Sequence, residues 1–470
     1  MANSTPLVES VSSARQSPLW WADVDLTKPD RPPLLTDLAV DVAIVGGGFS
    51  GLWSAYYLKK HDPKLEIAIL EAGFVGFGAS GRNGGWCSSL FPASWSKLAS
   101  RSSESSALTM ARLMRETVDV VGRFATEHQL DIDWQKGGTV LVAHDQLQLE
   151  RAREHVESEH QWGNDAMRLL SSGELQKVCH TRGLGATFDP SCAVIQPAKL
   201  VAGLARIVEN MGVRIFEKTR VNELLPKQGS TATAVVGGLA VRAPVILRAT
   251  ESYSSLLPKA KREIVPVYSL MIATEPLSKE SWQNIGLTDR TTFADYGNLV
   301  IYGQRTADDR IAFGGRGAPY HFGSSISAKH DQDLTVHRSL ATTLGHWFPD
   351  VMKSRVEYRW GGPVGIPRDW SAAVRYDQQT GLGSVGGYVG DGVGTSNLAG
   401  RTFADLVVGN NSELTAMPWV NQPLHKWEVE PFRWLGVNAA ITAVQAADWF
   451  ESRTGRDAPW APVLSKLTGD

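Results

Sequence analysis

The sequence predicts an α/β protein (α+β overall), in which a domain with a parallel sheet, assembled from discontinuous segments, joins a second domain built on an antiparallel sheet. Three observations support this prediction. Residues 41–71 follow the order strand, glycine turn, helix, strand. Residues 382–408 place another strand and glycine-rich turn before a helix, far along the chain. Between them, residues 263–317 lose the helical period and alternate as strands do.

The first of these stretches contains a recognisable binding motif. Asp41–Val45 is a short apolar run, typical of a strand buried on both faces, and a GxGxxG turn follows it directly. Gly46 permits the tight turn, Gly48 lets a pyrophosphate approach the backbone, and Gly51 lets the helix pack close to the sheet. Glu71 ends the next strand, where its carboxylate can accept hydrogen bonds from ribose hydroxyls. The motif predicts a Rossmann-like dinucleotide site, and the acid favours FAD or NAD over NADP.

Two further glycine-rich stretches accompany this motif. Residues 72–86, AGFVGFGASGRNGGW, are too rich in glycine for regular structure and too long for a turn. We expect this backbone to run along an extended polar ligand, the alternative being a flexible surface loop. Residues 387–394, GYVGDGVG, lead into a helix that we expect to begin near Gly394 or Thr395, with Ser396 and Asn397 in its first turn. Such a helix start is a second candidate anion site.

The composition excludes several classes of protein. A chain of 470 residues suits two or three domains, and 43% hydrophobic with 20% charged residues is typical of a globular protein. A net charge of −2 gives no sign of nucleic-acid or anionic-membrane binding. Three cysteines without CxxC spacing predict neither a disulfide framework nor a metal site. We find no secretory signal and no apolar run long enough to span a membrane, so we expect a cytoplasmic protein.

The remaining elements follow from periodicity and turn residues. We expect helices at 104–128, 146–161, 197–211 and 329–348 and one in the tail to about Arg453. We expect strands at 191–195, 213–216, 219–224, 241–249, 265–274, 298–304, 310–315, 356–364 and 383–385, and a hairpin in 133–144 around Gly137-Gly138. His155 and His160 are expected on the surface, and residues 1–38 are expected to wrap the domain that follows. The predicted domains are 1–95, 190–258 and 355–418 for the nucleotide, 96–189 and 259–354 for the substrate, and a packed helical tail at 419–470.

The GxGxxG motif at residues 46–51, which we call the fingerprint, the GASGRNGG loop and the GYVGDGVG segment together resemble the D-amino-acid-oxidase-like FAD-dependent oxidoreductases. The resemblance covers roughly residues 38–440 and is strongest for the γ-glutamylputrescine-oxidase branch. It implies non-covalent FAD along the cofactor's whole length. The residues that it places at FAD are Gly46, Gly48, Phe49, Ser50, Gly51, Glu71, Ala72, Gly78, Ala79, Ser80, Arg82, Asn83, Gly84, Gly85, Trp86, Val221, Ala249, Thr250, Gly390, Gly392, Val393, Gly394 and Thr395.

The chain departs from that branch at two positions. Asp391 stands where the branch often has histidine, and we expect it to point away from the flavin or to pair with a cation. Glu251 replaces the asparagine of an Ala-Thr-Asn-Ala strand end and can mark a different substrate. No cysteine follows Cys192, which excludes one covalent flavin linkage of relatives; Cys87, beside Trp86, leaves another possible.

The activity that the resemblance implies is oxidation of an amine or amino-acid-like substrate, with oxygen or another acceptor taking the electrons. Arg316, His321, Trp360 and Tyr388 are the candidate catalytic residues, and Tyr268, Tyr302 and Arg368 are further pocket candidates. Each has a structural alternative: a surface ion pair for an arginine, a structural histidine, a core tryptophan. Two other functions stay open. One is an FAD-dependent 2-hydroxy-acid dehydrogenase with His321 as base; the other is a non-catalytic flavin-binding subunit that docks through the tail after Pro418.

Overall fold

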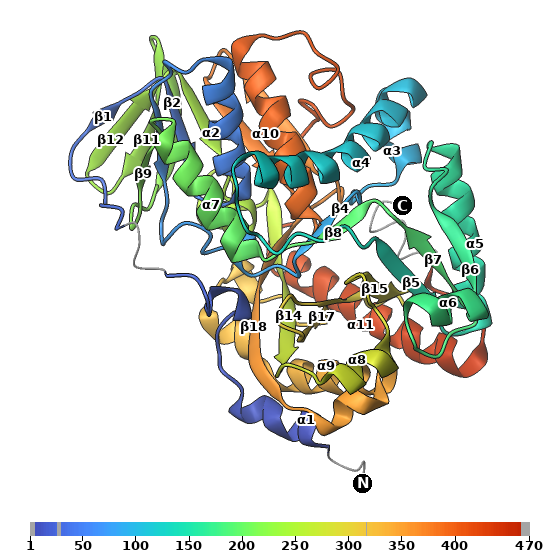
Figure 1. Cartoon of the computed structure of the whole chain (residues 1–470). Coiled ribbons are helices and arrows are strands. Elements are labelled where there is room, and N and C mark those ends of the chain that lie inside the picture. The colour runs from blue at the N-terminus through green and yellow to red at the C-terminus, as the bar shows by residue number, and fades with distance from the viewer. Residues whose placement is uncertain (1–4, 26–29, 316, 462–470) are drawn as a thin grey trace.

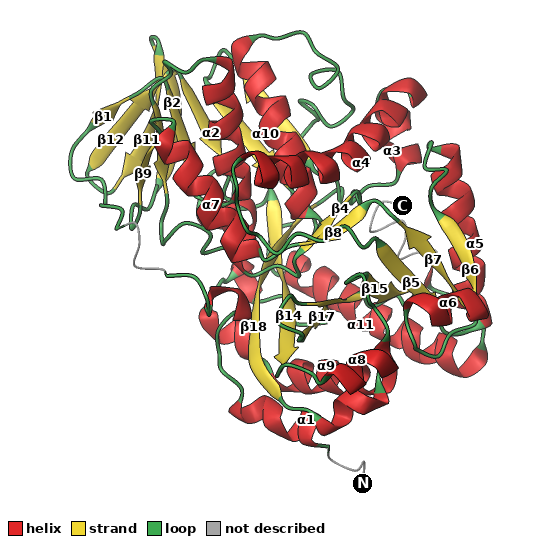
Figure 2. Cartoon of the chain, viewed as in Figure 1, coloured by secondary structure: helices red, strands yellow, loops and turns green. Residues whose placement is uncertain are grey.

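The computed structural model describes residues 5–25, 30–315 and 317–461, whose strands form four sheets (Figures 1 and 2). One sheet has six strands in the order β19-β20-β13-β2-β3-β9. All neighbours in it are parallel except β19 with β20. Its strands are β2 (Val42–Val45), β3 (Ile67–Leu70), β9 (Arg214–Phe216), β13 (Val245–Arg248), β19 (Ala373–Asp377) and β20 (Leu382–Gly386). This confirms a Rossmann-like sheet assembled from discontinuous segments.

The second large sheet has eight strands in the order β18-β14-β17-β16-β15-β5-β7-β6. It is antiparallel except where β15 pairs with β5, so the predicted antiparallel sheet is confirmed. Its strands are β5 (Thr139–Ala143), β6 (Arg168–Ser171), β7 (Gly185–Asp189), β14 (Ile264–Thr274), β15 (Thr292–Asp295), β16 (Ile301–Arg305), β17 (Ile311–Gly315) and β18 (Val356–Pro367). Residues 355–418 therefore supply strands to both large sheets, and the domain limits themselves stay a prediction.

Helices cover both sheets. Helices α2 and α10 pack against each other beside the parallel sheet, and a Cβ at Gly400 would lie only 2.7 Å from the Cβ of Trp53. Helices α8 and α9 lie below β14, β17 and β18 in Figure 1. The helices are α1 (Pro6–Ser10), α2 (Phe49–His61), α3 (Trp95–Arg101), α4 (Glu104–Glu127), α5 (Gln146–Gln161), α6 (Ser172–Val178), α7 (Pro197–Asn210), α8 (Lys279–Ile285), α9 (Leu334–Trp347), α10 (Gly392–Val408) and α11 (Phe432–Thr454). No helix of the described ranges is both long and apolar enough to cross a membrane.

Two small sheets complete the fold and correct one expectation. β1 (Leu38–Ala39), β10 (Glu223–Gln228), β11 (Thr231–Val236) and β12 (Leu239–Ala243) form a four-stranded sheet, and β4 (Trp86–Ser88) pairs with β8 (Cys192–Val194). The single strand expected at 241–249 is two strands, β12 and β13, in different sheets. Pro244 separates them, because proline has no N–H with which to continue a ladder.

Three other expectations were wrong in detail. The hairpin expected in 133–144 is the single strand β5, and Gln135 instead forms an isolated bridge with Val194. The strand expected at 219–224 begins only at Glu223. His155 is not a free surface residue, because it is half-buried and its Nδ1 lies 2.8 Å from the hydroxyl of Tyr296.

The N-terminal segment does not simply wrap the domain that follows it. Helix α1 packs on α9 and β18, and Leu7 and Val11 belong to the core of the eight-stranded sheet. Further along, Trp20 packs with Trp360, at 6.1 Å between ring centroids. The later part of the N-terminal segment does lie against the segments that follow, because Leu34 packs against the small four-stranded sheet and Arg31 pairs with Glu209 and Glu217.

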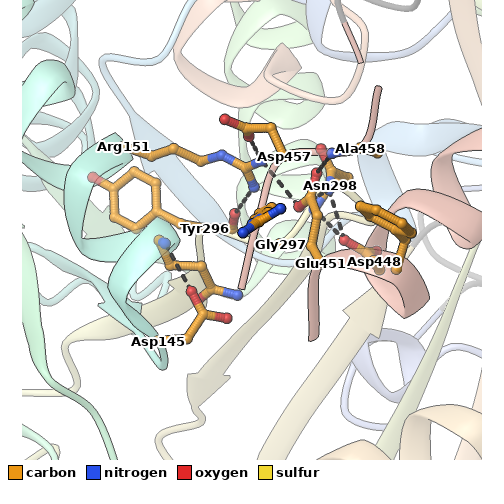
Figure 3. Close-up of polar contacts among 12 residues, drawn as sticks. Asp145, Arg151, Tyr296, Gly297, Asn298, Asp448, Glu451, Asp457 and Ala458 are labelled. Atoms are coloured by element: carbon orange, nitrogen blue, oxygen red, sulfur yellow. Dashed lines mark hydrogen bonds and ion pairs between the residues drawn. The ribbon is translucent and has the colours of Figure 1, made fainter. Parts of the chain in front are cut away.

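The tail forms the predicted helix, α11, and it fastens the loop between β15 and β16 (Figure 3). The carboxylate of Asp448 accepts hydrogen bonds from the backbone N–H groups of Asn298 (2.7 Å) and Leu299 (2.9 Å). Glu451 accepts a further bond from the Asn298 amide and pairs with Arg151 at 2.9 Å. Because this loop joins β15 to β16, the tail steadies the connection between two central strands of the eight-stranded sheet.

Candidate active site

The fingerprint turn joins β2 to α2 with almost no room for side chains. Gly46 has φ +111°, and a Cβ there would lie 2.5 Å from the carbonyl oxygen of Ala249. A Cβ at Gly51 would lie 2.1 Å from the carbonyl oxygen of Gly46. A Cβ at Gly48 would meet the Ser80 Oγ at 2.8 Å, and that oxygen also accepts a hydrogen bond from Phe49 N–H. The turn therefore presents bare backbone and a helix N-terminus, which suits a phosphate.

Glu71 lies where the sequence predicts a ribose-binding acid. One carboxylate oxygen accepts from Gly47 N–H and the other from Gly73 N–H, each at 2.7 Å. Burial raises the pKa of this carboxyl, and the two backbone donors oppose that rise. Each oxygen keeps a second lone pair, so the oriented carboxylate can still accept hydrogen bonds from hydroxyl groups.

A cavity of about 870 Å³ extends from this turn to the eight-stranded sheet. Most of the residues predicted at FAD line it: Gly46, Gly48, Phe49, Ser50, Glu71, Ala72, Gly78, Ala79, Ser80, Arg82, Asn83, Gly84, Trp86, Val221, Ala249, Thr250, Gly390, Gly392 and Val393. Gly51, Gly85, Gly394 and Thr395 are not among the lining residues. Gly394 instead packs on the carbonyl of Ser88, and the Thr395 hydroxyl donates to the carbonyl of Asp391 at 2.5 Å.

The guanidinium of Arg82 is already engaged by the protein. It donates to Asp331 at 2.7 Å, to the carbonyl of Gly361 at 3.1 Å and to the carbonyl of Phe77 at 2.9 Å. Desolvation raises the pKa of Asp331 to about 6, although Arg82 opposes the rise. Arg82 therefore lines the cavity and also connects the glycine-rich loop to β18 of the eight-stranded sheet.

Helix α10 begins at Gly392, two or three residues earlier than expected, so Ser396 and Asn397 lie in its second turn rather than its first. Asp391 is the residue before the helix, and it lines the cavity. That it points away from the flavin or pairs with a cation stays a prediction. Tyr388, predicted in the substrate pocket, also lines the cavity. Its hydroxyl lies 2.9 Å from the Ser50 Oγ, so this hydroxyl faces the phosphate turn.

Glu251 has a role that the sequence did not reveal. Its carboxylate accepts hydrogen bonds from Gly387 N–H (2.9 Å) and Tyr388 N–H (3.2 Å). The backbone that it holds has positive φ at Gly386, Gly387 and Gly390, a conformation that glycine adopts without strain. Burial raises the pKa of Glu251 to about 7, against the opposing effect of these donors and of Arg248. Glu251 thus positions the backbone that leads into α10.

The other predicted pocket residues lie mainly outside the cavity. Trp360 is buried, and its indole donates to the carbonyl of Arg82 at 2.8 Å. His321 stacks on His330 with ring centroids 3.4 Å apart, and burial and His330 lower its pKa. Arg368 pairs with Glu428 at 3.1 Å. The Tyr268 hydroxyl accepts from Ser327 N–H at 3.1 Å. Arg316 lies outside the described residues.

The wall contributed by the eight-stranded sheet is mostly apolar. Tyr302 lines it as predicted, and its hydroxyl lies 2.9 Å from the Ser269 Oγ. The residues missed there are Leu141, Ser269, Met271, Ala294, Asp295, Val300, Ile301, Gly362, Pro363 and Val364. The alternation along 265–274 could have placed Ser269 and Met271 on one face, but not on the face that meets the nucleotide motif.

The cysteines give no support for a covalent flavin. Cys87 is a wholly buried residue of β4, which pairs with β8, and burial raises the pKa of its thiol well above the usual range. It does not line the cavity. A buried thiol that stays protonated is a poor nucleophile, which agrees with non-covalent binding.

Comparison with known proteins agrees with this site. The family model described as FAD dependent oxidoreductase (DAO) matches residues 41–406. The probable oxidoreductase OrdL of Haemophilus influenzae is 27% identical over 398 residues, covering 83% of this chain and 88% of the relative. Gamma-glutamylputrescine oxidoreductase of Escherichia coli is 26% identical over 381 residues, covering 81% and 86%.

Solved structures share the fold at lower identity. Glycine oxidase from Geobacillus kaustophilus superposes with a TM-score of 0.69 at 20% identity, covering 83% of this chain and all of that one. L-amino acid deaminase from Proteus vulgaris superposes with a TM-score of 0.68 at 17% identity, covering 85% and 100%. The match of the family model over most of the chain, together with the glycine turn and the oriented acid, shows that this chain belongs to the DAO family of FAD-dependent oxidoreductases.

Proposed function

We propose that this protein oxidises the C–H bond next to the nitrogen of an amine or amino-acid-like substrate. One observation carries the proposal: a single cavity is lined at one end by the nucleotide motif and at the other by an apolar wall of the eight-stranded sheet. A redox cofactor held by the first can therefore meet a small molecule held by the second. The similarity to a gamma-glutamylputrescine oxidoreductase and to a glycine oxidase supports an amine or amino acid as substrate.

The residues present fit FAD. Glycines at 46, 48 and 51 leave space that a Cβ would fill, and Glu71 is oriented by two backbone donors. We infer that the fingerprint turn holds the pyrophosphate, that Glu71 binds the ribose, and that loop 78–86 and residues 390–393 contact the flavin half. When bound, FAD supplies a two-electron acceptor for a hydride from the substrate.

The apolar part of the wall opposite this motif favours a neutral amine. A free alkyl amine has a pKa near about 10, as lysine does, and is protonated at neutral pH. Leu141, Met271 and Ala294 offer no charge to an ammonium group, so desolvation beside them would lower the substrate's pKa, whereas the carboxylate of Asp295 on the same wall would raise it. The Ser269–Tyr302 hydroxyl pair can accept or donate a hydrogen bond and so orient the nitrogen. The imine product then takes up water and splits into an aldehyde, ketone or keto acid and the released ammonia or amine.

The hydroxy-acid alternative has less support. It would need a base against the substrate hydroxyl, and His321, the candidate for that role, stacks on His330 rather than lining the cavity. We infer that oxygen reoxidises the cofactor and yields hydrogen peroxide. We also infer that the protein is located in the reducing cytoplasm, because all three cysteines are buried and free.

Anaerobic bleaching of the bound flavin tests the proposal. Purified holoprotein would be mixed with a panel of primary and secondary amines, amino acids and 2-hydroxy acids, and the loss of visible flavin absorbance followed. We expect bleaching by at least one amine or amino acid and peroxide formation when air is admitted. Bleaching by a hydroxy acid alone would refute amine oxidation, and a bound flavin that no compound reduces would favour a non-catalytic flavin-binding subunit.

A further inference from the structure

Three consecutive carbonyl groups of the glycine-rich loop are each held by a different side chain. The indole of Trp360 donates to the carbonyl of Arg82 at 2.8 Å. The indole of Trp20 donates to the carbonyl of Asn83 at 2.7 Å, and the amide of Gln304 donates to the carbonyl of Gly84 at 2.5 Å. Helices and sheets satisfy carbonyls within the backbone, so side-chain donors at three successive residues fix each peptide plane separately.

These donors determine where the loop's N–H groups point. A trans peptide directs its C=O and N–H to opposite sides. The bond from Trp20 to the Asn83 carbonyl therefore turns the Gly84 N–H away from Trp20. Gly84 lines the cavity, and its N–H donates to no acceptor within the described part of the chain. The neighbouring N–H of Gly85 is occupied by the Asn83 side chain at 2.8 Å.

Trp20 belongs to a segment that we call the N-terminal strap, residues 5–25. The strap lies outside residues 41–406, which the family model matches. It is bonded along β18: Ser10 Oγ accepts from Val356 N–H at 2.8 Å, and Arg15 exchanges backbone hydrogen bonds with Glu357 and Arg359 at 2.9 Å each. The carbonyl of Trp20 accepts from the Gln196 amide at 2.6 Å. The position of the Trp20 indole is thus set from both sides.

Trp21 reaches another part of the same loop. A Cβ at Gly81 would lie 2.4 Å from the Trp21 ring, and one at Gly76 would lie 3.1 Å from it. The ring also contacts Phe74, with centroids 5.5 Å apart. The two adjacent tryptophans therefore hold the glycine-rich loop from Phe74 to Asn83.

We propose that the N-terminal strap is part of the flavin site, with Trp20 and Trp21 as positioning residues that set the loop before FAD binds. The strap then acts on FAD without touching it: it presents the Gly84 N–H to the cavity and fixes the backbone of residues 76–83. This inference rests on the proposed contact between loop 78–86 and the flavin half of FAD.

Trp20→Phe tests the role of the indole donor, because it keeps an aromatic ring and removes the N–H. FAD would be removed from the full-length protein, and its dissociation constant measured by flavin fluorescence titration. The band shape of the bound flavin would be read from its visible absorbance and circular dichroism. We expect FAD to bind about 5- to 30-fold more weakly, since a buried carbonyl loses its donor, and we expect a changed band shape.

Trp282→Phe is the matched control. Trp282 is buried like Trp20, and its indole also donates to a backbone carbonyl, that of Asp309, at 3.0 Å. That bond lies far from the glycine-rich loop in the chain, and neither residue lines the cavity. We expect this variant to lose thermal stability as Trp20→Phe does while it binds FAD with wild-type affinity and spectrum.

Trp21→Leu provides a second variant if Trp20→Phe does not fold, because it removes ring contacts and no hydrogen bond to the loop. Wild-type FAD affinity and spectrum in whichever strap variants fold would overturn the proposal. Equal weakening of FAD binding in Trp282→Phe would also overturn it, because the effect would then reflect general stability. Failure of the wild-type protein itself to bind FAD would instead refute the proposed function on which the strap's role depends.

Discussion

Replacement of Glu251 by glutamine should change how stability depends on pH. Burial raises the pKa of this carboxyl from 4.5 to about 7 in the folded protein, a shift worth roughly 3 kcal/mol. The folded state holds this proton more tightly than the unfolded state. The protonated Glu251 carboxyl therefore contributes its full stabilisation below pH 4.5, and this stabilisation is lost as the pH rises to about 7. Glutamine does not titrate, so Glu251→Gln should gain roughly 3 kcal/mol relative to wild type between pH 4.5 and pH 8.

A constant penalty accompanies this gain. The amide places a donor against the N–H of Gly387 or Tyr388, where the carboxylate accepted both, at a cost of about 1–3 kcal/mol at every pH. The test is therefore the change of the stability difference with pH, measured by urea unfolding with FAD in constant excess.

Asp377→Asn serves as the control for this measurement. Side-chain and backbone hydrogen bonds lower the pKa of Asp377 below 3.8, so its contribution is constant across pH 5–8. The stability difference between Glu251→Gln and wild type should change between pH 5 and pH 8. If it were as constant as that of Asp377→Asn, Glu251 would not be a buried carboxyl that binds a proton in the folded state.

Three further predictions concern other parts of the molecule. Gly46→Ala should abolish tight FAD binding and cost roughly 1–3 kcal/mol of stability, because φ is +111° and the new Cβ meets the Ala249 carbonyl. Titration with FAD measures the first effect and thermal melting the second, and an unchanged FAD affinity would contradict the proposed role of the turn. Asp448→Ala leaves two backbone N–H groups without their acceptor, so hydrogen exchange at residues 298–299 should speed up, whereas the exposed Ser452→Ala should leave it unchanged. Burial raises the pKa of all three thiols, so Ellman's reagent should label no cysteine in the native protein and three after denaturation; rapid native labelling would show that a thiol is accessible.

The nucleotide half could be predicted because its signals are local. The order of strand, glycine turn, helix and acid spans 31 consecutive residues, 41–71, and each residue type performs its task within that unit. The same holds for the helix at 104–128 and for the strand 265–274, whose periodicities lie within one element. Boundaries were less accurate where a proline divides a strand, at Pro244, or where a loop of unusual backbone precedes a helix, at Gly392.

The substrate half could not be predicted in the same way. Tyr388, Trp360 and His321 looked like pocket residues because of their chemistry, yet only Tyr388 lines the cavity, and its hydroxyl faces Ser50. Whether a side chain meets a ligand depends on strands that are far apart in sequence, such as β14 and β18, and on the register between them.

By itself, the sequence determined the class of cofactor and the fold of the domain that binds it, because glycine spacing and a strand-end acid are requirements of the local backbone. Only the tertiary structure decided which side chains hydrogen-bond to that backbone and hold it in place. Trp20, Gln304 and Trp360 converge on three successive carbonyls from 63, 220 and 278 residues away, and Glu251 reaches across 136 residues to Gly387. No periodicity or spacing records such contacts, because they form only when separate elements of the chain pack together.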